Sequence, residues 1–302
     1  INRITGVNGN PLEFESIGET SAALWYQADA RTYRVSDLRG SRQIVIEYSG
    51  YSEAQFGANS HSLLSLNPSA LWIPFGYGTK EGLDLCVHVL AEDYEVPGFK
   101  RTENPLIWRK SFNEPYAFLI IFKSAKVMQN AKATLYCDPL ADPVMAQTAI
   151  DCIEDILDRY TELTGLTNAP REQIVVSLPI EKNAGAYNDG EKIVLSRFVY
   201  DYPELAPEYS RFMPAPLISV FGHELAHFWC TGADANWEDW LNECSAEAFN
   251  LWYMRKTGYG DFVENHLEKM RQIVRVDKTP IRTPDGERPQ DCHHKGVILY
   301  EE

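Results

Sequence analysis

Residues 216–230 constrain the fold of this chain most, because they combine an apolar run with two histidines and a glutamate. The apolar residues occupy nearly every side of a helix, so we expect this helix to be buried. Residues 223–227 read His-Glu-Leu-Ala-His, which places His223 and His227 one helical turn apart on the same face. Buried imidazoles and a buried carboxylate need partners, because their desolvation is otherwise costly. A metal ion would serve all of them.

A second segment, predicted to be a helix over 238–256, supplies the next candidate metal ligands. Glu243 and Glu247 are four residues apart and share a face of that helix. We predict that Glu243 is the third metal ligand, and that Glu247 hydrogen-bonds a ligand histidine from behind, with Asn242 also supporting the ligands. The reverse assignment of Glu243 and Glu247 remains open, and so does a solvated position for Glu247 on the helix surface. Two histidines, one carboxylate and an open fourth position predict one catalytic zinc ion per chain, with Glu224 as general base.

The segment 222–250 resembles the gluzincin zinc aminopeptidases of the aminopeptidase N type, which carry HELAH followed by a helix containing WLNE. The same letters stand here at 223–227 and 240–243. The resemblance implies zinc ligation by His223, His227 and Glu243, and a thermolysin-like catalytic domain around them. The interval between the second histidine and the ligand glutamate is shorter here than in that family.

Two further motifs of the family are altered in this chain. The family's Tyr-x-Lys-Gly motif, whose tyrosine stabilises the oxyanion, corresponds to His-His-Lys-Gly at 293–296. His293 stands at the tyrosine position and could donate the same hydrogen bond. The family's GAMEN segment, whose glutamate holds the substrate's amino group, resembles residues 185–189. The residues that this resemblance implies for substrate binding are Gly185, Ala186, Asn188, at the glutamate position, and Asp189.

The expected activity is therefore zinc-dependent hydrolysis of peptide or protein substrates, aminopeptidase-like in its specificity. An endopeptidase or glycoprotein-directed gluzincin remains open, since the amino-anchoring glutamate is replaced. A zinc-binding relative without turnover, acting as a binding module, also remains open, because the family's tyrosine is missing.

Composition excludes some classes of partner. The chain of 302 residues has a formal charge of −15 and a pI of about 4.9, so nucleic acid phosphates would be repelled. No apolar run approaches the roughly 18 residues of a membrane-spanning helix. Six cysteines do not indicate a disulfide scaffold. An exported protein, periplasmic or extracellular, is favoured over a cytoplasmic one, and the oligomeric state stays open.

The pattern of elements predicts an α+β fold with two domains. Residues 1–140 form the expected antiparallel β domain, a sandwich or saddle-shaped sheet. Its predicted strands lie at 42–48, 83–90, 116–122 and 133–136. Residues 141–302 form the expected mainly helical catalytic domain. The chain ends soon after residue 296, where the family continues with further helix, so this domain is expected to be incomplete or to end differently.

Within the second domain, Asp142 and Pro143 predict the start of a helix that closes at Gly165. Strands are predicted at 174–178 and 192–196, the latter as the edge strand that lines a substrate cleft. An amphipathic helix is predicted around 262–274, with His266 at its surface.

Overall fold

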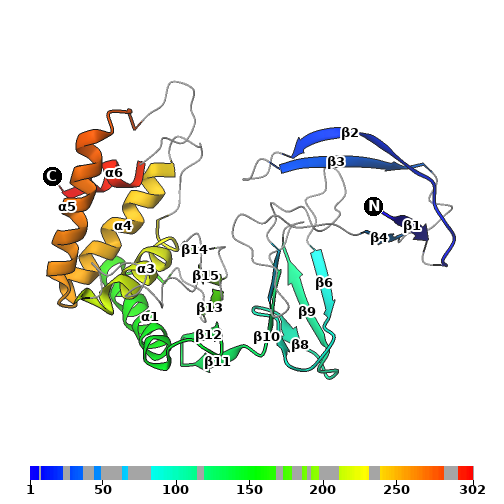
Figure 1. Cartoon of the computed structure of the whole chain (residues 1–302), viewed down its shortest axis with the longest axis horizontal. Helices are drawn as coiled ribbons and strands as arrows, with labels where there is room; N and C mark the ends of the chain where they lie inside the picture. Colours follow the sequence, from blue (N-terminus) through cyan, green and yellow to red (C-terminus); the bar gives the residue numbers. More distant parts are fainter. Residues whose placement is uncertain are drawn as a thin grey trace. The chain divides into compact units, whose positions relative to one another are not determined.

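The protein has a mixed α+β fold that divides into two compact units, residues 1–123 and 124–302. The computed structural model describes residues 1–6, 8–22, 28–36, 44–48, 63–66, 83–113, 119–167, 173–178, 186–188, 192–196, 211–230, 239–281 and 292–301. Each unit is described by itself below, and Figure 1 labels the elements of both.

The regular elements among the described residues of the first unit are β-strands. They are β1 (Arg3–Gly6), β2 (Phe14–Ala22), β3 (Ala28–Val35), β4 (Ile44–Glu47), β5 (Leu63–Leu66), β6 (Leu83–His88), β7 (Tyr94–Glu95), β8 (Lys100–Arg101), β9 (Ile107–Phe112) and β10 (Leu119–Lys123). Their pairings are antiparallel and form the small sheets β1-β4, β2-β3, β5-β10-β7 and β6-β9-β8. The described strands thus make several small sheets, not the single sandwich or saddle that we expected. Val96, Phe99 and Trp108 lie in a buried apolar cluster of this unit.

The second unit begins earlier than the predicted boundary at 140/141. The strands β11 (Lys126–Gln129) and β12 (Ala133–Cys137) form a hairpin, and β12 pairs in parallel with β13 (Gln173–Leu178). The predicted strand at 133–136 is confirmed, but it belongs to the second unit. Its pairing partner lies far along the chain, so local patterning could not assign it.

The described strands of the second unit form one sheet, and the helices of that unit are grouped beside it (Figure 1). The sheet order is β11-β12-β13-β15-β14, where β15 spans Lys192–Ser196 and β14 spans Ala186–Asn188. The described helices are α1 (Pro143–Thr164), α3 (Ala215–Ala226), α4 (Asp239–Lys256), α5 (Gly260–Val276) and α6 (Cys292–Glu301).

The edge of this sheet differs from the prediction. We expected the strand at 192–196 to be the edge, but β15 lies between β13, with which it is parallel, and β14, with which it is antiparallel. The side chains of Lys192 and Ile193 are buried, as befits an interior strand. Among the described strands, the three-residue β14 is the edge beside β15, and β11 is the opposite edge. Strand β14 was too short to be seen as a strand in the sequence.

Helix α1 forms where its capping residues predict it. Asp142 accepts hydrogen bonds from the backbone N–H groups of Val144 (2.7 Å) and Met145 (3.2 Å). Gly165 ends the helix in the left-handed conformation with φ 70°, where glycine is not strained. The predicted helix from 143 to 165 is therefore confirmed.

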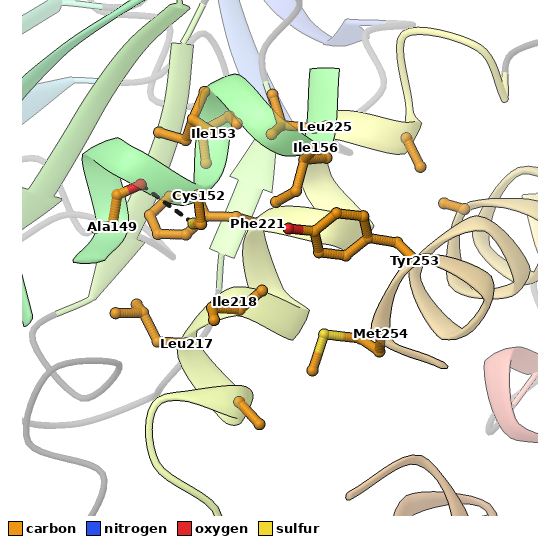
Figure 2. Packing of buried hydrophobic residues seen from close by; sticks show 14 of the residues in the cluster. Ala149, Cys152, Ile153, Ile156, Leu217, Ile218, Phe221, Leu225, Tyr253 and Met254 are labelled. Atoms are coloured by element: carbon orange, nitrogen blue, oxygen red, sulfur yellow. Dashed lines mark hydrogen bonds between the residues drawn. The ribbon is translucent and has the colours of Figure 1, made fainter. Parts of the chain in front are cut away.

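One apolar core joins the sheet to the helices of the second unit. It includes Leu135, Val175 and Ile193 from the strands, and many buried residues of α1, α3 and α4. Figure 2 shows Ile153 and Ile156 of α1 close to Phe221 and Leu225 of α3, with Tyr253 and Met254 of α4 beside them; a dashed line marks the hydrogen bond that the Cys152 thiol donates to Ala149 O (3.2 Å). This packing fixes α3, the helix that carries the His-Glu-Leu-Ala-His motif.

The cysteines whose side chains are described, namely Cys86, Cys137, Cys152, Cys230 and Cys244, are free thiols. None of the described helices is long and apolar enough to cross a lipid bilayer.

Candidate metal centre

Three side chains converge where α3 and α4 face each other. One ligand atom each from His223, His227 and Glu243 lies within 4.8 Å of the others, so the group could hold a metal ion. Glu243 Oε2 lies 3.2 Å from His223 Nε2 and 3.6 Å from His227 Nε2. Ligand atoms about 2.0–2.2 Å from a tetrahedral metal are separated by about 3.3–3.5 Å. The two distances to Glu243 bracket that separation.

Helix α3 presents both histidines from one face, as their spacing requires. The helix ends at Ala226, earlier than the predicted end at 230, and His227 continues the right-handed conformation with φ −58° and ψ −19°. The imidazole rings of His223 and His227 lie 5.0 Å apart between centroids and at 85° to each other. Both can therefore turn an Nε2 atom toward Glu243.

The close approach of α3 to α4 depends on a glycine. A Cβ atom added at Gly222 would lie 2.5 Å from Asn250 Oδ1, so a larger residue would force the helices or the amide to move. The Tyr160 hydroxyl of α1 donates a hydrogen bond of 2.9 Å to Gly222 O. Residue 222 thus fixes α3 against two other helices directly before the first histidine.

Glu247 lies behind the first histidine and is 7% exposed. Its Oε2 lies 2.9 Å from His223 Nδ1 and 3.2 Å from Asn250 Nδ2, and its Oε1 lies 3.1 Å from His266 Nε2. Since Nδ1 of His223 faces Glu247, its Nε2 is left to face Glu243 and His227. The tautomer with its hydrogen on Nδ1 would donate that hydrogen to Glu247 and leave the Nε2 lone pair for a metal ion.

The sequence predicted that His266 lies at the outer surface of α5, but in the structure its side chain faces Glu247 of α4. Its ring stacks on Phe262, with centroids 5.9 Å apart and an interplanar angle of 10°, and it points at Glu247. The amphipathic pattern of α5 correctly gave the helix, but it could not reveal that this side chain faces α4.

Burial and neighbouring charges shift the pKa values of the site. Burial raises the pKa of Glu224 to about 7, although His223 opposes the shift and Glu243 adds to it. Burial also raises the pKa of Glu247, but hydrogen bonds from His223 and His266 outweigh it and hold that pKa well below its ordinary value. For His223, burial lowers the pKa, while hydrogen bonds to the Glu243 and Glu247 carboxylates raise it well above its ordinary value.

Glu224 joins the metal group to the edge of the sheet. Its side chain is on α3 next to His223, and the residue is 7% exposed. Its backbone oxygen, near the helix end, accepts a hydrogen bond of 2.8 Å from Asn188 Nδ2 on β14. Because the last carbonyls of a helix lack helical donors, this amide satisfies one of them. The side-chain amide of Asn188 is thus used to attach the edge strand to α3.

Helix α6 packs on α4 through another glycine. A Cβ atom at Gly296 would lie 1.9 Å from Cys244 Sγ, which leaves no room for a larger residue. Lys295 is buried, forms an ion pair with Asp277, and donates a hydrogen bond of 2.6 Å to Thr279 Oγ1. His293 lies in α6 two residues before Lys295, but its side chain is outside the described residues.

The remaining predicted positions are placed only in part. Asn242 lies in α4 directly before Glu243 and is half-buried. Ala186 and Asn188 lie in β14, while Gly185 and Asp189 lie outside the described residues. Sequence reasoning missed His266 and Asn250. The spacing of Asn250 from Glu247, three residues on one helix, was a usable signal, whereas His266 lies on another helix.

Comparisons with protein-family models and with curated proteins find no match to this chain. The geometry of the site is therefore the basis for inferring its function. That geometry consists of three converging ligand atoms, the buried Glu224 carboxylate that interacts electrostatically with His223 and Glu243, and an edge strand attached to the same helix.

Proposed function

We propose that this chain is a zinc-dependent metallopeptidase that uses Glu224 to activate the attacking water. The observation that carries the proposal is the convergence of His223, His227 and Glu243 within 4.8 Å, together with the buried Glu224, whose carboxylate interacts electrostatically with His223 and Glu243. Three protein ligands with a remaining open position are typical of catalytic zinc, whereas structural zinc has four. Imidazole nitrogen and carboxylate oxygen together suit zinc among the common metals.

The chemistry follows from where the residues lie. A zinc ion bound by these ligands would lower the pKa of its water toward about 7 and polarise the scissile carbonyl. Glu224 then accepts the water's proton at its carboxylate and delivers it to the leaving amine nitrogen. Burial raises the pKa of Glu224 to about 7, which suits a group that must both take and give a proton near neutral pH. Glu247 holds the His223 ring, and His293 is the candidate donor to the oxyanion.

We further propose that the second unit, residues 124–302, is a thermolysin-like catalytic domain, as the resemblance of residues 222–250 implies. The antiparallel edge strand β14 is hydrogen-bonded to the helix that carries the base, through Asn188 and the Glu224 carbonyl. An extended peptide can add to such an edge as another strand, which would bring its backbone past the metal. The substrate is then a peptide or protein chain.

One observation favours endopeptidase activity over the aminopeptidase-like specificity that the resemblance implies. An aminopeptidase needs an anionic group that holds the substrate's free ammonium. The position expected to carry that group holds Asn188, whose amide is neutral and donates to Glu224 O. Without a carboxylate there, a free amino terminus gains no ion pair from this residue.

Two measurements on the purified chain test the proposal. Dialysis against a chelator should abolish peptide hydrolysis, and stoichiometric zinc should restore it. Hydrolysis of matched peptides with free and acetylated amino termini then separates the two specificities. Comparable rates support an endopeptidase, and a strong preference for the free amine supports an aminopeptidase. A chain that binds zinc but cleaves no member of a broad peptide library would contradict the proposal and favour a binding module.

A further inference from the structure

Glu247 is a buried carboxylate held from three helices. His223 on α3 and Asn250 on α4 contact its Oε2, and His266 on α5 contacts its Oε1. An ionised carboxylate is purely an acceptor, so each of these nitrogens must present a hydrogen to it. Removal of one donor from a buried charged acceptor leaves that oxygen without compensation.

His266 is well placed to fix the orientation of this carboxylate. Its Nε2 lies 3.1 Å from Oε1, the oxygen that His223 does not use. The imidazole stacks at 10° on Phe262, which is itself buried, so its plane is held by packing as well as by the hydrogen bond. With one oxygen contacted from α3 and the other from α5, the carboxylate has little freedom to rotate.

Asn250 holds the other oxygen of the Glu247 carboxylate, Oε2. Its side-chain nitrogen lies 2.8 Å from Ser219 Oγ and 3.2 Å from Glu247 Oε2. It is fully buried, and its oxygen occupies the space that Gly222 leaves free. Side chains of α3 and α4 therefore hold Oε2 of Glu247 in place, and α5 contributes the contact to Oε1.

We infer that His266 is a positioning residue of the metal centre, which acts through Glu247 to hold the ring of His223 with Nε2 toward the metal. This inference deepens the proposed function and rests on its assignment of His223 as a ligand. The coupling runs from α5, through Glu247, to a metal ligand on α3. A partner behind a ligand typically contributes 10- to 100-fold to metal affinity, and a group one step further away should contribute less.

The test compares His266→Phe, which removes the donor and can keep the stacking, with His266→Gln, which restores a neutral N–H donor. Gln272→Ala, an exposed change on the same helix, serves as the matched control. Zinc dissociation constants are measured by competition with a chromophoric chelator, and the ligand geometry by the visible spectrum of the cobalt-substituted chain. The thermal midpoint of each variant without added metal gives its fold stability.

We expect zinc affinity to fall by roughly three- to ten-fold in His266→Phe, with a shifted cobalt spectrum. The zinc affinity of His266→Gln and of the control Gln272→Ala should lie within about two-fold of that of the unsubstituted chain. Unchanged zinc affinity in a folded His266→Phe variant would overturn the inference, and so would equal losses in the Phe and Gln variants. Zinc binding that depends on His266 in a chain without peptidase activity would contradict the proposed function alone.

Discussion

The two sides of Glu224 are built in different ways. On the metal side, buried side chains from α3, α4 and α5 meet at Glu247, which contacts His223, Asn250 and His266. On the side proposed to bind substrate lies β14, a three-residue strand whose Asn188 donates a hydrogen bond to the backbone of α3. The positions of the candidate ligands therefore depend on contacts between side chains. The position of the edge strand depends on backbone pairing with β15 and on one identified side-chain contact.

The largest expected effect comes from removing a ligand on the metal side. His227→Ala leaves two protein ligands, which should reduce zinc affinity and peptide hydrolysis each by roughly a thousand-fold or more. Metal analysis after gel filtration and a peptide cleavage assay measure the two losses. His88→Ala, an exposed histidine on β6 of the first unit, is the matched control and should change neither quantity. A His227→Ala chain that keeps stoichiometric zinc would contradict the ligand assignment.

A smaller effect is expected where α3 meets α4. Gly222→Ala places a methyl group 2.5 Å from Asn250 Oδ1, so the interface must open, at a cost to the free energy of unfolding of about 1–3 kcal/mol. Denaturant unfolding measures this cost. At Gly260, an added Cβ meets nothing within 4 Å, so Gly260→Ala should leave stability within about 0.5 kcal/mol. Equal stability of the two variants would argue against close packing at residue 222.

The smallest effect is expected on the substrate side. Asn188→Ala removes the hydrogen bond to Glu224 O, which should cost about 1 kcal/mol in stability. We expect zinc affinity to stay within about two-fold, since this hydrogen bond is made to a backbone oxygen and not to a ligand side chain, while KM rises several-fold as the edge strand shifts. Calorimetry, chelator competition and steady-state kinetics separate these outcomes. A large loss of zinc in Asn188→Ala would show that the two sides are not built independently.

The sequence predicted those features that depend on neighbouring residues. The Asp142 cap and Gly165 fixed the bounds of α1, and the helical spacing of His223 and His227 gave one shared face. Features that depend on distant pairing were missed or misplaced. The strand at 192–196 was predicted as the edge because β14 is too short to show a pattern, and the unit boundary was misplaced because β12 pairs with β13.

Within the candidate site, too, the residues related by local spacing could be predicted, and the one placed by packing between helices could not. Glu243 and Glu247 could be found because they lie four residues apart on one helix, near the histidines in sequence. His266 could not, because its role requires the packing of α5 against α4, which no local pattern encodes. The oxyanion role of His293, the substrate roles of Gly185 and Asp189, the support from Asn242 and the exported location stay predictions.

The central claim is that Glu224 activates water beside a metal held by His223, His227 and Glu243. Its most direct test is the rate of peptide hydrolysis by Glu224→Gln, measured at full zinc occupancy beside the unsubstituted chain. Glutamine keeps the size of the side chain but cannot accept the proton, so kcat should fall by roughly a hundred-fold or more while zinc stays bound. Hydrolysis by Glu224→Gln at the rate of the unsubstituted chain would contradict the account.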